Sequence, residues 1–296
     1  MDKPRIAIFY ESRLHRNDGN PLYVWASLKR RQEKGELEID HLAPTGDTDL
    51  FGKYNMLVWV DWGEDGLGGL LPYKPVFPDK STDAPVVYWA SDTHVGYKHR
   101  LDTARKADVV FVAQKDAVDR FAADWVPGAI WLPHAVEPAA YPHFNYAAKK
   151  YDVGFVGHVS SSNRIDMLDR AFREFPNFYY GQRLFEKAAE RYCQTKVCLN
   201  ISMKDDINMR CFEVLGCGSF LLTDRTSNIE EIFEDGKHLV LYDSLDDMVE
   251  KARYYIEHDE EREAIAKAGM EYVLANHTID HRVDKMLKTV KDLVPA

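Results

Sequence analysis

The sequence predicts an α/β protein made of two doubly wound domains, each with a parallel sheet covered by helices on both faces. Short, continuously apolar segments alternate with amphipathic ones along most of the chain, a pattern typical of buried parallel strands joined by helices. The alternation stops once, near residues 137–150, and then starts again. A length of 296 residues is sufficient for two domains of this kind.

Six apolar segments and three amphipathic segments make up the first half. The strands are expected at 5–9, 37–41, 55–60, 86–89, 108–112 and 129–132, and the helices at 21–33, 94–104 and 115–123. A long irregular stretch, 61–83, separates two of these strands, and loops of that length commonly serve as lids or connectors. We therefore expect a first Rossmann-like domain over residues 1–138.

The segment EPAAYPHFNYAAKK, residues 137–150, contains two prolines and no clear periodicity. These features are typical of a linker, which we assign to residues 139–150. The second domain is then expected over 151–277, with residues 278–296 as a C-terminal amphipathic helix. Its strands are predicted at 152–156, 178–180, 196–201, 220–223 and 238–242, and its helices at 163–175, 184–192, 208–215, 229–233, 245–258 and 260–276.

Composition excludes several classes of protein. No run approaches the roughly 20 apolar residues of a membrane helix, and the first residues lead directly into a strand, so we expect a cytoplasmic protein without an integral membrane segment. The net charge of −10 argues against nucleic acid as a partner. The four cysteines form no CxxC pair, which favours free buried thiols over a metal site.

Polar residues follow many of the predicted strands, at the edge where open parallel sheets bind ligands. For each of them, an ordinary polar loop is the alternative explanation. In the second domain the residues that follow strands are Gly157, His158, Ser202, Lys204, Asp205 and Asp224, and Asn200, near the end of the predicted strand 196–201, is a further candidate for donor binding. In the first domain they are Asp92, His94 and His134.

The segment GHVSSSNR, residues 157–164, joins a predicted strand to a predicted helix. A glycine allows a phosphate to approach the backbone, and the helix N-terminus offers N–H groups and a positive dipole. Arg164 could add a charge-assisted hydrogen bond, so the segment is a candidate diphosphate site. The alternative is ordinary N-capping by Ser162 or Asn163, which needs no ligand.

One stretch carries a family resemblance. The run NMRCFEVLGCGSFLLTD (208–224), with the residues up to 269, resembles the nucleotide-binding half of the spore-maturation-type bacterial glycosyltransferases. YWASDTHVGY (88–97) and WLPHAVEP (131–138) resemble segments that lie at the cleft in that family. The resemblance implies two Rossmann-like domains facing across a cleft, the GT-B architecture, with a final helix that returns to the first domain.

The resemblance also implies an activity. It predicts transfer of a sugar from a UDP- or GDP-type donor to an acceptor held by the first domain. The acceptor could be a protein, a polysaccharide, a lipid-linked glycan or a small molecule. No cofactor or metal is expected, because Arg164, Lys204, Arg210 and a helix terminus would compensate the diphosphate charge.

The resemblance gives two acids a role. Glu213 would bind the ribose hydroxyls, which suit a bidentate acceptor. Asp205, eight positions earlier, stands where the family usually has Glu and would lie near the sugar. Arg210 could pair with Glu213 at i,i+3. We favour instead a contact with the diphosphate, where negative charge develops as the glycosidic bond breaks.

In the first domain, His94 and Asp92 could orient an acceptor hydroxyl or take its proton. Asp92 could equally cap the following helix, and His134 could face the sugar or a phosphate. The Asp205 and Glu213 pair slightly favours retention, whereas inversion would require a base such as Asp92 or His94. A non-catalytic nucleotide-sugar or glycan-binding protein and a sugar-nucleotide epimerase are the competing interpretations.

Overall fold

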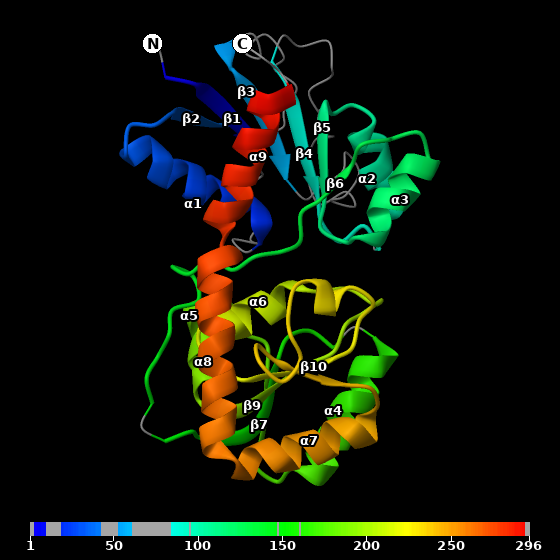
Figure 1. Ribbon diagram of the computed structural model, residues 1–296, viewed down its shortest axis with the longest axis vertical. Helices are drawn as coiled ribbons and strands as arrows, with labels where there is room; N and C mark the ends of the chain where they lie inside the picture. The colour runs from blue at the N-terminus through cyan, green and yellow to red at the C-terminus, as the bar shows by residue number, and fades with distance from the viewer. Residues whose placement is uncertain are drawn as a thin grey trace. The chain divides into compact units, whose positions relative to one another are not determined.

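The structure is a computed structural model that describes residues 3–9, 19–42, 53–60, 84–94, 96–146, 148–159 and 161–293. The chain divides into two compact units (Figure 1). Unit 1 consists of Met1–Pro133 and Ile279–Ala296, and unit 2 is His134–Thr278. The division lies at Pro133, before the predicted end of the first domain at residue 138. The segment 139–150, predicted as a linker, lies within unit 2.

Unit 1 is built on a parallel sheet. Its six strands among the described residues are arranged in the order β2-β1-β3-β4-β5-β6. All ten residues of β3 and β4 are buried, as expected for apolar strands covered on both faces. The strands are β1 Arg5–Phe9, β2 Glu38–Leu42, β3 Met56–Val60, β4 Val86–Ala90, β5 Val109–Val112 and β6 Ile130–Trp131.

Helices cover both faces of this sheet. α2 (Tyr97–Ala104) and α3 (Asp116–Ala123) share a core with one face through Leu101 and Phe121. α1 (Asn20–Glu33) packs on β2 and β3, and α9 (Ile279–Leu293) packs on α1. α2 begins at Tyr97 and not at His94 as predicted, because Gly96 adopts a left-handed conformation (φ 78°) directly before it.

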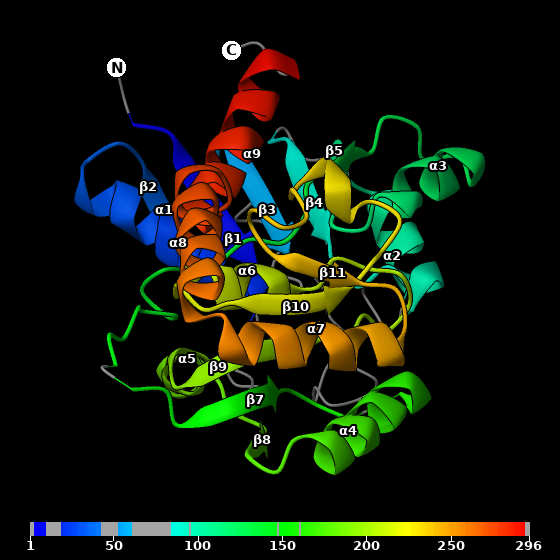
Figure 2. The same ribbon diagram turned by 60° about the horizontal axis from the view of Figure 1, so that its bottom comes forward.

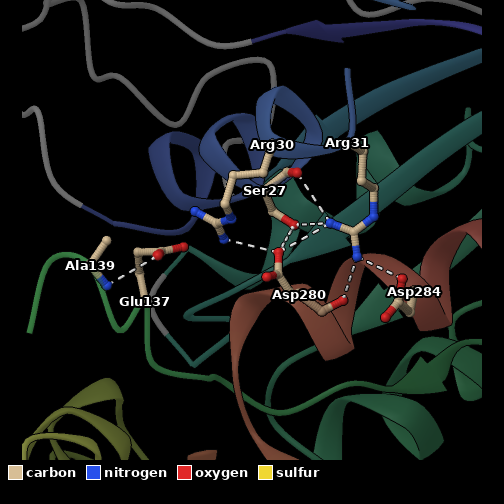
Figure 3. A network of polar contacts seen from close by, with 7 residues as sticks. All are labelled: Ser27, Arg30, Arg31, Glu137, Ala139, Asp280 and Asp284. Carbon is tan, nitrogen blue, oxygen red and sulfur yellow. Dashed lines mark hydrogen bonds and ion pairs between the residues drawn. The ribbon is translucent and has the colours of Figure 1, made fainter. Parts of the chain in front are cut away.

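Ion pairs attach α9 to α1 (Figure 3). Arg31 of α1 is 8% exposed and donates to Asp280 over 3.1 Å and to Asp284 over 2.6 Å. Arg30 contacts Asp280 over 2.9 Å, and the Ser27 hydroxyl donates to the same carboxylate over 2.5 Å. The last helix therefore belongs to the same unit as the first strand, although it follows unit 2 in the sequence.

Unit 2 also contains a parallel sheet. Its five strands in the described part of the chain are arranged in the order β11-β10-β9-β7-β8. β9 lies at the centre and is buried except at Lys196. The strands are β7 Tyr151–Val156, β8 Phe178–Gly181, β9 Thr195–Asn200, β10 Leu221–Asp224 and β11 Val240–Tyr242.

The helices of unit 2 form a layer on each face of the sheet (Figure 2). α4 (Ser162–Glu174) and α7 (Leu245–Glu257) bury Met167 and Met248 against one face. α5 (Glu186–Cys193) and α6 (Met209–Gly216) pack on the other, and α8 (Asp259–Asn276) packs on α6. The segment predicted as a helix at 229–233 is a short 3-10 helix, Ile229–Glu231.

The predicted fold class is confirmed: each unit is a parallel sheet between helices. Cys193, Cys198, Cys211 and Cys217 are free and buried, as predicted. Among the helices that the structure describes, none is sufficiently long and apolar to cross a membrane.

Candidate functional site

The candidate site lies where the strand order of the second sheet reverses. β7 has β8 on one side and β9 on the other, so the chain leaves the carboxyl end of the sheet in two directions. In doubly wound sheets this reversal leaves room for a ligand beyond the strand ends. Here Gly157 follows β7, Ser202 lies just beyond β9, and Asp224 ends β10.

Arg210 spans this reversal point. It lies in the first turn of α6, and its Nε donates to the Val156 carbonyl at the end of β7 over 2.7 Å. Its Nη1 donates to Oδ1 of Asn200, the last residue of β9, over 2.6 Å. The guanidinium also lies over the Phe155 ring, with 4.3 Å between Cζ and the ring centroid. The charge is thereby held at the carboxyl ends of two neighbouring strands.

Gly157 leaves room for this side chain. A Cβ at residue 157 would overlap Nη2 of Arg210 and would lie 3.0 Å from its Cζ. The absence of a side chain at Gly157 therefore allows the guanidinium to reach the end of β7. The expected approach of a phosphate to the Gly157 backbone stays a prediction.

Arg164 is the second buried cation of the site. Its side chain, on the first turn of α4, is 6% exposed. Its Nη1 donates to the His158 carbonyl over 3.1 Å, while Nε and Nη2 contact the Ile201 carbonyl at 3.4 and 3.3 Å. Burial, followed by the charge of Arg210, lowers the pKa of Arg164 to about 10. Arg164 consequently stays charged at neutral pH.

Carboxylates lie near Arg164 without forming a direct ion pair. The charges of Asp206 and Asp224 oppose the lowering of the pKa of Arg164. Within the described ranges, no ion pair joins Arg164 or Arg210 to an Asp or a Glu. The i,i+3 pairing of Arg210 with Glu213 is therefore not formed. Two like charges that disfavour one another at the end of a sheet would be stabilised by a bound anion.

The hydrogen bonds of Asn200 position Arg210. Besides accepting from Arg210, its Oδ1 accepts from Nδ2 of Asn208 over 3.2 Å. Its own Nδ2 donates to the Thr223 hydroxyl over 2.9 Å, which links β9 to β10. Asn200 is 1% exposed, and its side chain holds the Arg210 guanidinium in position through their hydrogen bond.

Ser202 and Asp224 form a second link between these strands. The amide and the hydroxyl of Ser202 both donate to the Asp224 carboxylate, over 2.9 and 2.6 Å. Burial raises the pKa of Asp224, although the Ser202 hydrogen bonds oppose this shift. The predicted residues Ser202 and Asp224 are thus brought together, with their polar groups directed at one another.

Asp205 and its neighbours shape the loop after β9. Asp205 is exposed, has φ 55°, and accepts from the Ser227 amide over 2.8 Å and from its hydroxyl. It therefore ties this loop to the loop after β10. Lys204 is exposed. Asp206 is 6% exposed and accepts from the Met203 amide over 3.1 Å.

Glu213 lies one turn after Arg210 on α6 and is half-buried. Its charge is close enough to act on Tyr192: burial, and then Glu213, raise the pKa of that phenol. The helix is otherwise apolar at Phe212, Val214 and Leu215, which are fully buried. The buried residues of α6 fix the helix against the core, and the position of the Glu213 carboxylate is fixed with it.

The candidates predicted in the first domain fall into both units: Asp92 and His94 lie in unit 1, and His134 lies in unit 2. Asp92 is exposed with φ 49°, and His94 is half-buried two residues later. The alternative of Asp92 as a helix N-cap is wrong, because α2 starts after Gly96. His134 is 2% exposed and belongs to unit 2.

The N-capping alternative for the segment 157–164 also fails. The N-cap of α4 is Ser161, neither Ser162 nor Asn163, and the Ser161 side chain forms no capping hydrogen bond with the described residues. Oδ1 of Asn163 accepts from the Arg164 amide over 3.1 Å, and its Nδ2 donates to the Ser202 carbonyl over 2.9 Å, which connects α4 to the loop after β9.

Sequence reasoning missed three supporting residues. Phe155, under both guanidinium groups, lies inside a strand and is indistinguishable from core in the sequence. Thr223 and Tyr242 hold Asn200, the latter by donating to its carbonyl over 2.8 Å. Their position at the ends of β10 and β11 is the signal that could have identified them.

Comparison with known families decides the class of this region. Residues 144–288 match the family model described as glycosyl transferase-like. The matched region is glycosyltransferase-like. Most of it, residues 144–278, lies in unit 2. The predicted glycosyltransferase class is therefore confirmed for this region, whereas the spore-maturation-type group stays a prediction. No curated protein matches the sequence significantly.

Solved structures with the same architecture establish the fold. Sucrose-phosphate synthase from Thermosynechococcus elongatus superposes with a TM-score of 0.66 at 13% identity, over 98% of this chain and 99% of that chain. HepE from Anabaena, in complex with UDP-glucose, superposes with a TM-score of 0.64 at 11% identity, over 98% of this chain and 100% of the HepE chain. A candidate UDP-N-acetylglucosamine 2-epimerase from Listeria monocytogenes superposes with a TM-score of 0.59 at 9% identity, over 99% of this chain and 97% of that chain. The fold is GT-B.

Proposed function

We propose that the protein transfers a sugar from a nucleoside-diphosphate sugar to an acceptor. The observation that carries this proposal is the pair Arg164 and Arg210, one buried and one half-buried cation at the strand reversal of a glycosyltransferase-like region. Neither forms an ion pair with a carboxylate among the residues that the structure describes. A diphosphate supplies the anion that such a pair favours.

In this mechanism the two arginines act mainly on the leaving group. As the bond between sugar and phosphate breaks, negative charge grows on the diphosphate, and pre-positioned cations stabilise that state more than the ground state. Each charge-assisted hydrogen bond contributes about 1.5–3 kcal/mol. Glu213 would accept from the ribose hydroxyls, and Asp205 would lie near the sugar.

A uridine donor is the first choice. The HepE structure of the same fold contains UDP-glucose, which supports testing this donor before GDP sugars. We propose that the arginines, rather than a metal, compensate the diphosphate, and that Asp92 or His94 assists the acceptor. Retention, membership of the spore-maturation-type group and the cytoplasmic location remain predictions from the sequence.

The binding test uses isothermal titration calorimetry with UDP-glucose and with UDP. Replacement of Arg210 by Gln should weaken UDP binding by about 10-fold or more, because one charge-assisted hydrogen bond is lost. Lys187→Gln is the matched control, since Lys187 is exposed on α5 of the same unit. Absence of binding by UDP-glucose, UDP, GDP-mannose and GDP would refute the proposal.

A second measurement separates transfer from the competing activities. The donor is incubated alone and followed by NMR of the anomeric proton. Isomerisation without an acceptor would indicate an epimerase, and binding without hydrolysis or transfer to any acceptor would indicate a binding protein. Slow release of UDP, accelerated by an acceptor, is the expected result for a transferase.

A further inference from the structure

A pocket lies in unit 2, away from the reversal point. It has a volume of about 380 Å³, and residues 143–146 and 149 line it on one side and α8 on the other. Its walls include Lys196, at the beginning of β9, and Phe220, just before β10. These residues mark the amino end of the sheet, whereas Arg210 and Asn200 lie at the carboxyl end. The pocket is therefore a separate site within the same unit.

The lining is basic although the whole chain is acidic. Lys149, Lys196, Arg262 and Lys267 line the pocket together with a single acid, Glu263. The net charge of the chain is −10, whereas the side chains that line this pocket carry four positive charges and one negative charge. Such an excess attracts anions.

The charges differ in how far they are compensated. Arg262 pairs with Asp259 over 2.6 Å, and Lys196 pairs with Asp152 over 3.2 Å. Lys267 contacts Glu271 at 3.9 Å, and 73% of its side chain is exposed. Lys149 donates to the Cys193 carbonyl over 2.9 Å and, within the described residues, forms no ion pair. Lys149 and Lys267 are therefore the cations best able to meet a bound anion.

The other walls are apolar and aromatic. Phe144 and Tyr146 lie in the segment before β7 with ring centroids 6.3 Å apart, and Phe220, Ala266 and Met270 provide further apolar surface. Pockets that combine apolar walls with a few polar groups are typical of small-molecule sites, and 380 Å³ lies within their usual size range.

The pocket is shaped by fixed contacts. His143 lines it, and its Nδ1 is 2.7 Å from the Cys217 carbonyl. Because a carbonyl only accepts, Nδ1 must carry the proton. Gly218 has φ 76°, and a Cβ there would lie 2.7 Å from the His143 ring and 2.8 Å from the Met270 sulfur. The missing side chain at Gly218 thus leaves room for two of the walls.

We infer that this pocket binds a small organic anion that carries an aromatic ring. The ring would pack on the aromatic and methionine walls, and the anionic group would be bound by Lys149 and Lys267. This inference does not depend on the proposed transferase activity, because the pocket and the arginine pair share no residue.

Methyl NMR of the protein labelled at its eight methionines can test the inference. Met270 lines the pocket, and Met209 starts α6 at the other edge of the sheet, so one methyl reports each site. The probes are phenyl phosphate, inorganic phosphate and phenol. We expect phenyl phosphate to shift Met270 saturably and at least about 10-fold more tightly than either fragment probe.

The double variant Lys149→Gln, Lys267→Gln should weaken phenyl phosphate binding at Met270 by about 10-fold or more, and Lys187→Gln should leave it unchanged. Lys267 is exposed and Lys149 is half-buried, so circular dichroism would verify that the variant is folded. No saturable Met270 shift at millimolar phenyl phosphate would overturn the inference. Equal affinity for inorganic phosphate, or a shift at Met209 alone, would overturn it as well.

Discussion

Arg210 and Gly157 show how a single missing side chain shapes the candidate donor site. The guanidinium makes one hydrogen bond to each of two neighbouring strands and stacks on Phe155. This arrangement is possible because position 157 carries no Cβ. Gly157 therefore contributes to the site by leaving space for the Arg210 guanidinium, as well as through its own backbone.

Gly157→Ala should displace Arg210 and weaken UDP binding by about 10-fold, measured by calorimetry, because the guanidinium can no longer reach its position. The matched control is Gly236→Ala, whose Cβ would meet nothing within 4 Å. Since Gly236 has φ 76°, the control should lower stability by about 1 kcal/mol and leave UDP affinity unchanged. Equal UDP affinity in Gly157→Ala and wild type would contradict this account.

At the scale of elements, the attachment of α9 to α1 depends on Asp280. Burial opposes its ionisation, but hydrogen bonds from Ser27, Arg30 and Arg31, together with the charge of Arg30, lower the pKa of Asp280 to about 2. The folded pKa is thus below the unfolded value of about 3.9. The stabilisation is present above pH 4 or so and is lost as the pH falls to about 2.

Asp280→Asn should lower the free energy of unfolding by about 1 kcal/mol at neutral pH, a value reduced for the partial exposure of the carboxylate. The difference from wild type should shrink between about pH 4 and pH 2, because protonation then removes the same charge. Urea unfolding at several pH values measures it. Asp292→Asn, which breaks the exposed pair with Lys288 on the same helix, is the control and should change little. A pH-independent difference would argue against the ion pairs.

The packing of α8 on α6 depends on another glycine. A Cβ at Gly269 would overlap the His238 carbonyl and lie 2.9 Å from a methyl of Leu215. Because the His238 backbone is the main obstacle, α8 would have to move away from the segment that precedes β11, and the Leu215 side chain of α6 would have to shift as well.

Gly269→Ala should therefore destabilise unit 2 by about 1–3 kcal/mol, measured by thermal unfolding followed by circular dichroism. Ala264→Ser, on the exposed face of α8, is the control and should have an effect within about 0.5 kcal/mol. A stabilised Gly269→Ala variant would show that α8 can move away from the His238 backbone without loss of stability.

At the scale of the whole molecule, the two units can be observed separately. The sequence contains six tryptophans, and all of them lie within residues 1–133 of unit 1. They are Trp25, Trp59, Trp62, Trp89, Trp125 and Trp131. Tryptophan fluorescence thus follows unit 1, while far-UV circular dichroism follows both.

UDP-glucose should raise the circular-dichroism transition of unit 2 more than the fluorescence transition, because the proposed phosphate contacts lie in unit 2. A free concentration of 100 times Kd would add about 2.7 kcal/mol to the unit that binds. Parallel denaturation curves with both probes measure the effect. Equal shifts in both signals would indicate that the two units unfold together.

Much of the fold could be predicted from the sequence because apolar strands buried on both faces leave an unambiguous pattern. β3 and β4 are examples, and their predicted positions differ only at the ends. The beginning of α2 was less predictable, because whether Gly96 ends a turn or continues a helix depends on its backbone conformation. The 3-10 segment at Ile229–Glu231 was missed for a similar reason, since short apolar runs suit either helix type.

The sequence by itself determined the fold class, the glycosyltransferase-like motif and the residues Arg164, Arg210 and Glu213 as candidates. The fold class, the motif and the candidate residues could be predicted because each depends on a pattern among residues that are close together in the sequence. Only the tertiary structure decided that Arg210 reaches two strands, that Gly157 makes room for it and that Arg164 shares its aromatic platform. These contacts join residues up to 55 positions apart, such as Phe155 and Arg210. Such contacts arise from the register of a parallel sheet, which periodicity does not encode.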